Sequence, residues 1–275
     1  MATAHLNFIG AGNMARAILG GLIANGYQAS SISACAPNSG ELDSLKAEYP
    51  INTSLDNNAF IDHTDVLLLC TKPQVLKAAC EGIRDSVQAR KPLIVSIAAG
   101  VTIAQIEEWL GGDLPVVRCM PNTPALVHIG ASGLFANSRV SPEQKNLAAS
   151  LFESVGLVAW VPAESDLHTV TALSGSGPAY CFMFIEAMEK AAIGLGLNAA
   201  DARALAIQTM RGAAELASRS EESPEQLKRR VMSPGGTTER AVSRFEQEKL
   251  AEVVAAAIGD AWSRSYELAG EEPPA

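Results

Sequence analysis

The segment "FIGAGNMARAILGG", residues 8–21, carries the strongest indication of the fold of this chain. It places Gly10, Gly12 and Ala15 in the pattern G-x-G-x-x-A, directly after a short apolar run and at the start of an amphipathic segment. The first glycine allows a tight turn, the second lets a pyrophosphate approach the backbone, and the alanine permits close packing of helix on strand. The start of the helix then faces the anion. We expect a dinucleotide-binding loop here, and a tight strand-helix turn without a ligand is the simpler alternative.

Short apolar runs continue to alternate with amphipathic stretches as far as about residue 161. Several of these runs are apolar throughout, which is typical of parallel strands that helices cover on both faces. This series of βαβ units predicts an α/β fold, with a Rossmann-type, doubly wound sheet in an NAD(P)-binding domain over residues 1–162. The runs that we interpret as strands include residues 66–70, 93–98, 131–136 and 156–161.

After Pro162 the pattern changes, and only helices are expected. The segment 178–195 carries just three charged residues over about five helical turns. A helix that is apolar nearly all round has to be buried on nearly all sides, and so small a domain cannot bury it alone. We therefore expect residues 163–275 to form an all-α dimerisation domain, in which helices of two chains interleave. The expected helices are residues 178–195, 199–219, 224–232, 238–246 and 248–268.

Composition restricts the function classes. The chain has 275 residues, 48% of them hydrophobic and 19% charged, as in folded globular proteins. Its net charge of −9 repels phosphate backbones, and the longest basic run, Lys228–Arg230, is typical of a solvated helix face, so no nucleic-acid partner is expected. The five cysteines are scattered without C-x-x-C pairs or histidines at metal spacing, which predicts reduced core thiols and no metal. No signal segment and no apolar run of about 18 residues is present, so we expect a cytoplasmic protein without a membrane partner.

The end of the second expected strand bears on the choice of cofactor. An acidic residue about 20 positions after the glycines would bind the ribose 2′-hydroxyl of NAD. This chain has "ACAPNSG" there, with no acid before Glu41. Asn38 and Ser39 are able to hydrogen-bond a 2′-phosphate, so NADP(H) is favoured. An ordinary turn with a helix cap is the alternative.

Ligands of doubly wound sheets lie beyond the carboxyl ends of the strands, so the other loops at that edge matter too. Lys72 is a candidate for contact with phosphate or ribose, and its alternative is a solvated lysine before a helix that begins at Pro73. Ala98 and Ala99 are small enough for a nicotinamide ring to pack against them. The stiff loop 121–124 either positions a polar group over the ring or is a rigid crossover.

Two segments rich in glycine and serine interrupt the helical domain: "SGSGPAY" (174–180) and "SPGGTT" (233–238). Glycines followed by hydroxyls at the start of a helix expose several backbone N–H groups in one concavity, which suits a small carboxylate. A helix-helix corner capped by Thr237 or Thr238 is the compatible alternative. The donors expected in the second segment are Ser233, Gly235, Gly236, Thr237 and Thr238.

Six motifs, in this order and spacing, resemble those of the pyrroline-5-carboxylate reductase family over nearly the whole chain. They are "GAGNMA", "TKPQ", "SIAAGV", "RCMPNTPA", "TALSGSGPAY" and "VMSPGGTTERAV". The resemblance implies reduction of 1-pyrroline-5-carboxylate to L-proline, the last step of proline biosynthesis, by hydride transfer from NAD(P)H. NADPH is often preferred in this family and NADH is also possible. The resemblance further implies a homodimer that interlocks through its C-terminal helices, and it leaves a higher oligomer of dimers open.

The resemblance also assigns residues. This chain departs from the family at Arg230, where some members have Asn, and at Leu167-His168, where members commonly have an apolar or Asp-Ala pair, so contacts at these positions stay open. We interpret His168 as structural. The substrate would be held by Ser233, Gly236, Thr237 and Thr238, with Glu221 nearby. The cofactor would be lined by Ile9, Gly10, Ala11, Gly12, Asn13, Met14, Asn38, Asn57, Cys70, Thr71, Lys72, Pro73, Ile97, Ala98 and Ala99.

Reduction of a cyclic imine requires a hydride on its carbon and a proton on its nitrogen. A threonine hydroxyl is too weak an acid to protonate the imine, so we expect protonation from solvent and orientation of the nitrogen by Thr238, the catalytic candidate. A β-hydroxyacid-type dehydrogenase or a related imine reductase is an alternative. Members of those families resemble one another in having a Lys with an Asn four residues later in the long helix. In this chain the residue four positions after Lys190 is Gly194, which argues against this alternative. A redox sensor without catalysis, the third possibility, would need no carboxylate pocket.

Overall fold

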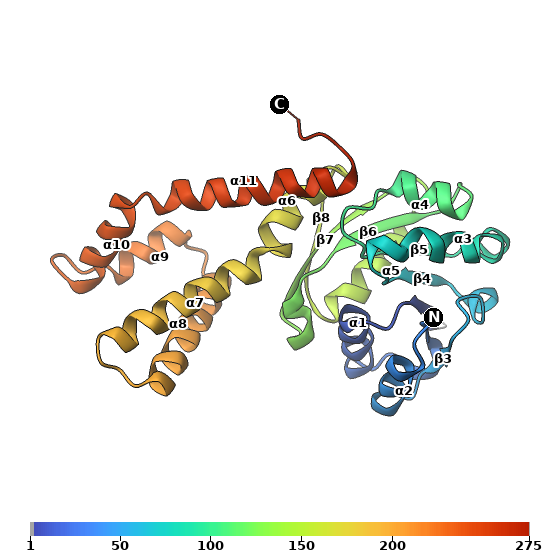
Figure 1. The fold of residues 1–275 in the computed structure, drawn as a ribbon, viewed down its shortest axis with the longest axis horizontal. Coiled ribbons are helices and arrows are strands. Elements are labelled where there is room, and N and C mark those ends of the chain that lie inside the picture. The colour runs from blue at the N-terminus through green and yellow to red at the C-terminus, as the bar shows by residue number, and fades with distance from the viewer. Residues whose placement is uncertain (1–2, 275) are drawn as a thin grey trace. The chain divides into compact units, whose positions relative to one another are not determined.

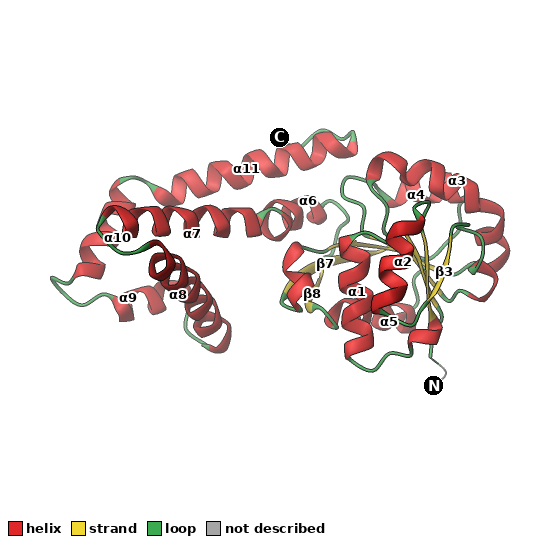
Figure 2. Cartoon of the chain, turned by 60° about the horizontal axis from the view of Figure 1, so that its bottom comes forward, coloured by secondary structure: helices red, strands yellow, loops and turns green. Residues whose placement is uncertain are grey.

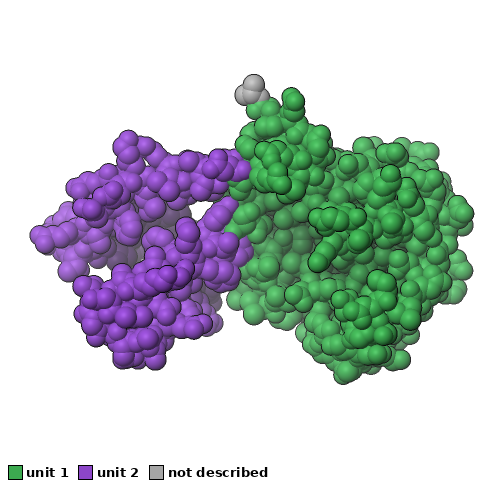
Figure 3. All heavy atoms as spheres, viewed as in Figure 1, with its two compact units in different colours: residues 1–176, 261–275 green, residues 177–260 purple. Residues whose placement is uncertain are grey.

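The structure is a computed structural model that describes residues 3–274 of the chain. Two compact units make up the chain (Figure 3). Unit 1 comprises residues 1–176 and 261–275, and unit 2 is Gly177–Asp260. The predicted domain boundary near residue 162 follows the last strand of the sheet and precedes the start of unit 2.

Unit 1 is built on an eight-stranded sheet with the order β3-β2-β1-β4-β5-β6-β7-β8 (Figure 1). The first six strands are parallel, and Phe8 of β1 pairs with Ala34 of β2 on one side and with Leu68 of β4 on the other. This confirms the predicted α/β fold with a doubly wound sheet. The strands are β1 (Leu6–Ile9), β2 (Ile32–Cys35), β3 (Asn52–Ser54), β4 (Val66–Leu69), β5 (Leu93–Ser96), β6 (Val116–Met120), β7 (Gly130–Ala136) and β8 (Gly156–Trp160).

The sheet departs from a plain βαβ series at β7, which runs antiparallel to β6. A parallel pair needs a crossover connection of a dozen or more residues, and the link between β6 and β7 contains only the short 3-10 helix Thr123–Val127. Strand β8 returns parallel to β7 after helix α5 (Pro142–Glu153). Ser141 caps α5, and Pro142 is its first residue.

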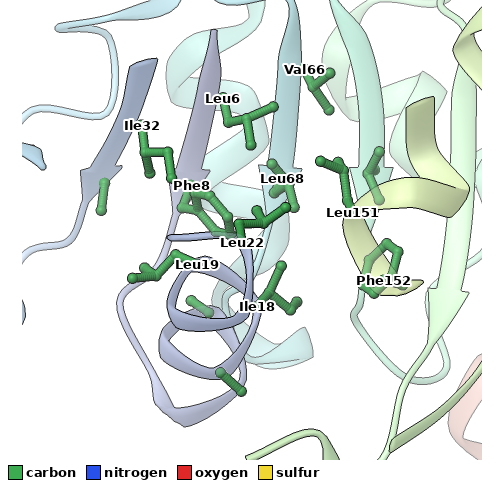
Figure 4. Close-up of a cluster of buried hydrophobic side chains, with 14 of the residues drawn as sticks. Leu6, Phe8, Ile18, Leu19, Leu22, Ile32, Val66, Leu68, Leu151 and Phe152 are labelled. Atoms are coloured by element: carbon green, nitrogen blue, oxygen red, sulfur yellow. The ribbon is translucent and has the colours of Figure 1, made fainter. Parts of the chain in front are cut away.

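Helices cover both faces of the sheet, which explains why its strands are apolar throughout. On one face lie α1 (Asn13–Ala24), α2 (Ser39–Glu48) and α5, which Figure 2 shows in front of the sheet. Their side chains meet Phe8 and its neighbours in one buried cluster (Figure 4). On the other face α3 (Pro73–Arg90) and α4 (Ile103–Leu110) form a second cluster with β4 and β5.

The segment "SGSGPAY" is not the loop that the sequence suggested. Helix α6 (Asp166–Val170) continues through a single π turn, Thr171–Gly175, in which the Ser176 amide donates to the Thr171 carbonyl at 2.8 Å. A Cβ on Gly175 would lie 2.7 Å from Cε of Met120, so this turn packs closely against the side chain at the end of β6. Turns of this kind often mark functional sites.

Unit 2 is entirely helical, as predicted. Its helices begin and end within three residues of the expected bounds, and helix ends are defined no better than one or two residues. The last helix belongs to unit 2 as far as Asp260 and to unit 1 beyond it. No helix within residues 3–274 has the length and apolar character needed to cross a membrane. The helices are α7 (Gly177–Gly194), α8 (Ala199–Arg219), α9 (Pro224–Val231), α10 (Thr237–Gln247) and α11 (Leu250–Ala269).

Candidate active site

The carboxyl ends of four neighbouring strands form one edge in unit 1. The Gly10 amide donates to the Cys35 carbonyl at 2.7 Å, and the Cys70 amide donates to the Ile9 carbonyl at 2.8 Å. The Ile97 amide donates to the carbonyl at the end of β4, Leu69, at 3.1 Å. The predicted cofactor loops after β1, β2, β4 and β5 therefore lie side by side.

The two glycines of the first loop have opposite surroundings. Gly10 has a φ of +108°, and a Cβ there would lie 2.7 Å from the carbonyl oxygen of Cys70, so the turn requires glycine. Gly12 has a φ of −71°, and a Cβ there would have no protein atom within 4 Å. Gly12 caps α1 without a side-chain hydrogen bond, and the first turn of α1 holds no acid. The open backbone at the start of α1 thus fits an anion such as a pyrophosphate.

The β1 loop residues that follow the turn differ in exposure. Ala11 is buried, Asn13 is exposed and Met14 is half-buried. Asn13 and Met14 are the first two residues of α1, so the helix start leaves polar atoms accessible while its apolar side chains enter the core.

The loop after β4 offers a second sign of a ligand. The Thr71 hydroxyl is buried and has no hydrogen-bond partner within residues 3–274. Burial raises the pKa of the Cys70 and Cys119 thiols, so both stay neutral. Lys72 is exposed and makes no ion pair in the described part of the chain, and Pro73 begins α3. The loop combines an unpaired buried hydroxyl with a free cation, which fits a polar, anionic cofactor.

At the end of β2 the side chain of Asn38 caps a helix. Its Oδ1 accepts a hydrogen bond from the Gly40 amide at 2.9 Å, as the alternative interpretation expected. Asn38 and Ser39 remain exposed, and the first acid beyond β2 is Glu41 in the first turn of α2. Asn57 is half-buried in the turn that follows β3. No carboxylate therefore stands between β2 and α2.

The loops after β5 and β6 differ in kind. Ala98 is buried, and Ala99 is half-buried beside it. Asn122, by contrast, is held by two hydrogen bonds, from its Nδ2 to the Ser174 carbonyl at 3.0 Å and to its Oδ1 from the Ala131 amide at 2.9 Å. Both polar atoms of the Asn122 amide are thus hydrogen-bonded within the chain, which restrains the loop as the rigid-crossover interpretation expects.

The segment "SPGGTT" of unit 2 forms a turn followed by the start of α10. The Gly236 amide donates to the Ser233 carbonyl at 2.9 Å, and Gly235 has a φ of +71°, which places Pro234 and Gly235 at the centre of a type II turn. The Gly235 amide donates to Oε2 of Glu239 at 2.6 Å. The predicted amide donors Gly235 and Gly236 are thus already paired within the chain.

The amides of Thr237 and Thr238, unlike those of Gly235 and Gly236, have no hydrogen-bond partner within the described residues. The first N–H groups of a helix have no partner inside it, and Gly236 caps α10 without a side-chain bond. The alternative in which Thr237 or Thr238 caps the helix is therefore wrong. Thr238 is half-buried, and Ser233 and Thr237 are exposed. The donors left for a carboxylate are the two threonine amides and the hydroxyls of this segment.

Glu239 is the residue that the sequence analysis missed. Its signal was present, since an acid at the third position of a helix often bonds back to an amide before that helix. Glu221 lies exposed in the loop between α8 and α9. The next residue in the chain, Glu222, forms an ion pair with Arg230 at 2.6 Å.

The basic run of α9 is exposed, and each of its cations has an acidic partner. Lys228 pairs with Glu246 at 3.1 Å, and Arg229 pairs with Glu225 at 2.5 Å. With the Arg230 pair, the three positive charges are matched by three glutamates. The run presents no unpaired basic patch to a polyanion.

His168 is structural in its surroundings, as interpreted. Its ring is 3% exposed, contacts Ser265 Oγ at 2.8 Å through Nδ1 and Glu271 Oε2 at 3.2 Å through Nε2, and stacks on Tyr266. Within residues 3–274 no group of three or more His, Cys, Asp or Glu side chains is placed to hold a metal ion.

Two further residues of α7 bear on the sequence analysis. Cys181 is exposed in the single chain, so the expectation that the cysteines are core residues is wrong for it, while Cys35, Cys80 and Cys119 are buried. Lys190 pairs with Glu186 one turn earlier on an exposed face, so it has the contacts of a surface lysine.

Comparison with known proteins agrees with this geometry. Residues 164–268 match the family model described as pyrroline-5-carboxylate reductase dimerisation, and residues 5–100 match that of NADP oxidoreductase, coenzyme F420-dependent. A pyrroline-5-carboxylate reductase of Pseudomonas aeruginosa is 45% identical over 269 residues, which cover 98% of each chain. That of Escherichia coli is 38% identical and covers 96% of this chain and 97% of its own.

Solved structures give the same result. A pyrroline-5-carboxylate reductase from Coxiella burnetii superposes with a TM-score of 0.93 at 45% identity, covering 97% of this chain and 98% of that one. The enzyme of Plasmodium falciparum, solved with NADP bound, has a TM-score of 0.85 at 28% identity, covering 98% of this chain and 99% of that one. By nearly full-length identity and by fold, the chain belongs to the pyrroline-5-carboxylate reductase family.

Proposed function

We propose that the chain reduces 1-pyrroline-5-carboxylate to L-proline, the last step of proline biosynthesis and the reaction of its family. The observation that carries this proposal is the start of α10, where the amides of Thr237 and Thr238 are unpaired behind a turn whose own amides are satisfied. Such a start binds a small carboxylate without a cationic side chain. The dinucleotide loop of unit 1 accounts for the second ligand.

The nicotinamide cofactor is held by residues of unit 1. Gly12 gives the pyrophosphate access to the start of α1, Thr71 supplies an unpaired hydroxyl, and Lys72 supplies a free positive charge. Ala98 and Ala99 give the small side chains that a flat ring needs. A bound reduced nicotinamide supplies the hydride.

The substrate is held by residues of unit 2. Its carboxylate takes the amides of Thr237 and Thr238 and the hydroxyl of Ser233, and the Thr238 hydroxyl orients the ring nitrogen. The proton on that nitrogen comes from solvent, because a threonine hydroxyl is too weak an acid. Catalysis is mainly positioning, which has to bring the reacting carbon to within about 3 to 3.5 Å of the hydride. Glu221 and Gly236 complete the proposed substrate set, the glycine as a shaping residue of the turn.

Replacement of the Thr238 hydroxyl tests this assignment. We expect Thr238→Ala to lower kcat/KM for the imine about tenfold or more, which corresponds to about 1.4 kcal/mol. Thr238→Ser keeps the hydroxyl and is the matched control, and it should retain most of the activity. The measurement is NADPH oxidation with 1-pyrroline-5-carboxylate. An alanine variant with the kcat/KM of the unchanged enzyme would remove Thr238 from the mechanism.

We further propose that NADPH is preferred over NADH. The support is the absence of an acid between β2 and α2 and the exposure of Asn38 and Ser39. Asn38→Asp would place a carboxylate where the 2′-phosphate is expected, and it should raise KM for NADPH about tenfold while KM for NADH changes little. Asn38→Ser, which keeps a capping oxygen without charge, is the control. Equal effects on both cofactors would contradict the preference.

The apolar surface of unit 2 supports a homodimer through the C-terminal helices. Helix α7 has no buried residue in the single chain, and Phe182 is 64% exposed, Met183 67% and Val253 60%. Large apolar side chains exposed in this way favour an interaction site, and the matched dimerisation model covers these helices. Sedimentation equilibrium should show a dimer or a larger assembly of dimers. A folded, active monomer at working concentration would refute the proposal, and cell fractionation would test the expected cytoplasmic location.

A further inference from the structure

We propose that Glu239 is a positioning residue for the substrate carboxylate: it holds the Pro234–Gly235 turn in place so that the amides of Thr237 and Thr238 stay open to the ligand. This inference rests on the proposed function and deepens it. It concerns a residue that no step of the proposed chemistry uses directly.

The turn before α10 has reason to need a restraint. Gly235 is in the left-handed region at a φ of +71°, and Gly236 follows it, so two residues without side chains stand next to each other in an exposed segment. Glycine pairs lose more conformational freedom on ordering than any other residues. An unrestrained turn would therefore make ligand binding weaker by the cost of ordering it.

Glu239 supplies such a restraint. Its Oε2 accepts the Gly235 amide at 2.6 Å, reaching back from the third residue of α10 across the turn. A carboxylate acceptor makes a hydrogen bond roughly twice as strong as a neutral one. Its negative charge is also favoured at the start of a helix. The half-buried side chain is thus held by geometry and by charge.

The bond sorts the amides of the segment into two groups. The amides of Gly235 and Gly236 serve the turn, since they bond to Glu239 and to the Ser233 carbonyl. Those of Thr237 and Thr238 remain available. Because Glu239 is itself an anion, it repels a bound carboxylate, so its benefit is pre-organisation rather than attraction. Pre-organisation of the turn strengthens binding of the carboxylate and repulsion weakens it, so the dissociation constant of a Glu239 variant shows which effect is larger.

The experiment compares three variants of the full-length enzyme. Glu239→Ala removes the acceptor, Glu239→Gln keeps a neutral acceptor, and Glu248→Ala, at the other end of α10 where Glu248 pairs with Arg244, is the matched control. Each is assayed for KM and kcat with 1-pyrroline-5-carboxylate, for KM with NADPH, and for the dissociation constant of L-proline by calorimetry. Hydrogen exchange of the peptide 231–240 reports on the turn itself.

We expect Glu239→Ala to raise both KM for the imine and the dissociation constant of L-proline about tenfold, the worth of a hydrogen bond to a charged group. The value of kcat should change much less, KM for NADPH should stay the same, and exchange in residues 231–240 should become faster. Glu239→Gln should fall between, at about threefold. Glu248→Ala should match the unchanged enzyme in every measurement.

Tighter binding of L-proline to Glu239→Ala would overturn the inference, because repulsion would then exceed pre-organisation. Unchanged constants would overturn it as well. If Glu239→Ala does not fold, Glu239→Gln and its exchange rates decide by the same criteria. The proposed function is tested separately by the enzyme without substitutions. If that enzyme does not reduce the imine, the proposed function fails. If it does, the variants test the role of Glu239 alone.

Discussion

The two units of this chain differ in how much of their apolar surface a single chain buries. In unit 1, Phe8 is fully buried and α1 places seven of its residues in the core. In unit 2, α7 is at least as apolar in sequence, yet Phe182 is 64% exposed. The dinucleotide loop is therefore shaped by a core that one chain completes, and the substrate loop belongs to helices that need a second chain.

Two phenylalanines give the largest test of this difference. We expect Phe8→Ala to lower the free energy of unfolding of unit 1 by about 3 to 5 kcal/mol, independently of protein concentration, because it opens a cavity in a closed core. Phe182→Ala should act instead on the dimer, by raising its dissociation constant, and its unfolding midpoint should fall as the protein is diluted. Urea unfolding at several concentrations and sedimentation measure both. An unchanged dissociation constant of the dimer for Phe182→Ala would contradict this difference between the units.

A buried ion pair sharpens the description of unit 1. Arg118 on β6 has a 7% exposed side chain and pairs with Glu164 at 2.7 Å, and the same carboxylate oxygen accepts the Ile103 amide at the start of α4. Glu164→Ala would leave the guanidinium buried without its partner and should cost about 2 to 3 kcal/mol in chemical unfolding. Glu164→Gln keeps an acceptor and should cost less. Equal losses for the two variants would contradict this, because they would mean that a neutral acceptor contributes nothing and that the charge of Glu164 accounts for the whole effect.

Alkaline pH should weaken unit 1 selectively. Burial raises the pKa of Cys35 and of Cys80 to about 12, above the value of an unfolded thiol near 9. The contribution is complete below pH 9 and is lost as pH rises toward 12, because the unfolded thiol releases its proton first. Each thiol should remove up to about 1.4 kcal/mol of unfolding free energy per pH unit in that window. Cys80→Ser should flatten the pH dependence of the unfolding free energy measured by urea unfolding.

The smallest effect is expected at the surface of unit 2. Arg229 and Glu225 form an exposed pair one helical turn apart on α9. Such pairs contribute little, so Arg229→Ala should change the thermal stability of the dimer by less than about 0.5 kcal/mol. A loss well above that value would place Arg229 in an interface.

Much of the fold is local in origin and was predictable. The loop from Gly10 to Ala15 is specified by adjacent residues, and the helices of unit 2 follow from apolar periodicity and from capping residues such as Ser223. Strand β3 was missed because three polar residues carry no strand pattern. The exposure of Cys181 was missed because an apolar helix in sequence does not say which chain covers it.

The site was predictable only in part, because its details depend on contacts between distant residues. The role of Asn122 is fixed by the Ser174 carbonyl, 52 positions along the chain, and the π turn that brings it there has no simple sequence signal. The pairing of the Gly235 amide with Glu239 is local, but it competes with a ligand for the same donor. Sequence alone does not say which of the two acceptors takes it.

The contrast between Gly10 and Gly12 has a consequence for how this protein tolerates change. Any side chain at position 10 collides with the backbone after β4, so such variants would be lost in a selection for folded protein alone. A methyl group at position 12 meets no protein atom, so alanine there would survive that selection and fail only when growth depends on the enzyme. One mutant library screened for folded protein and, separately, for growth would thus distinguish residues that folding requires from residues that cofactor binding requires.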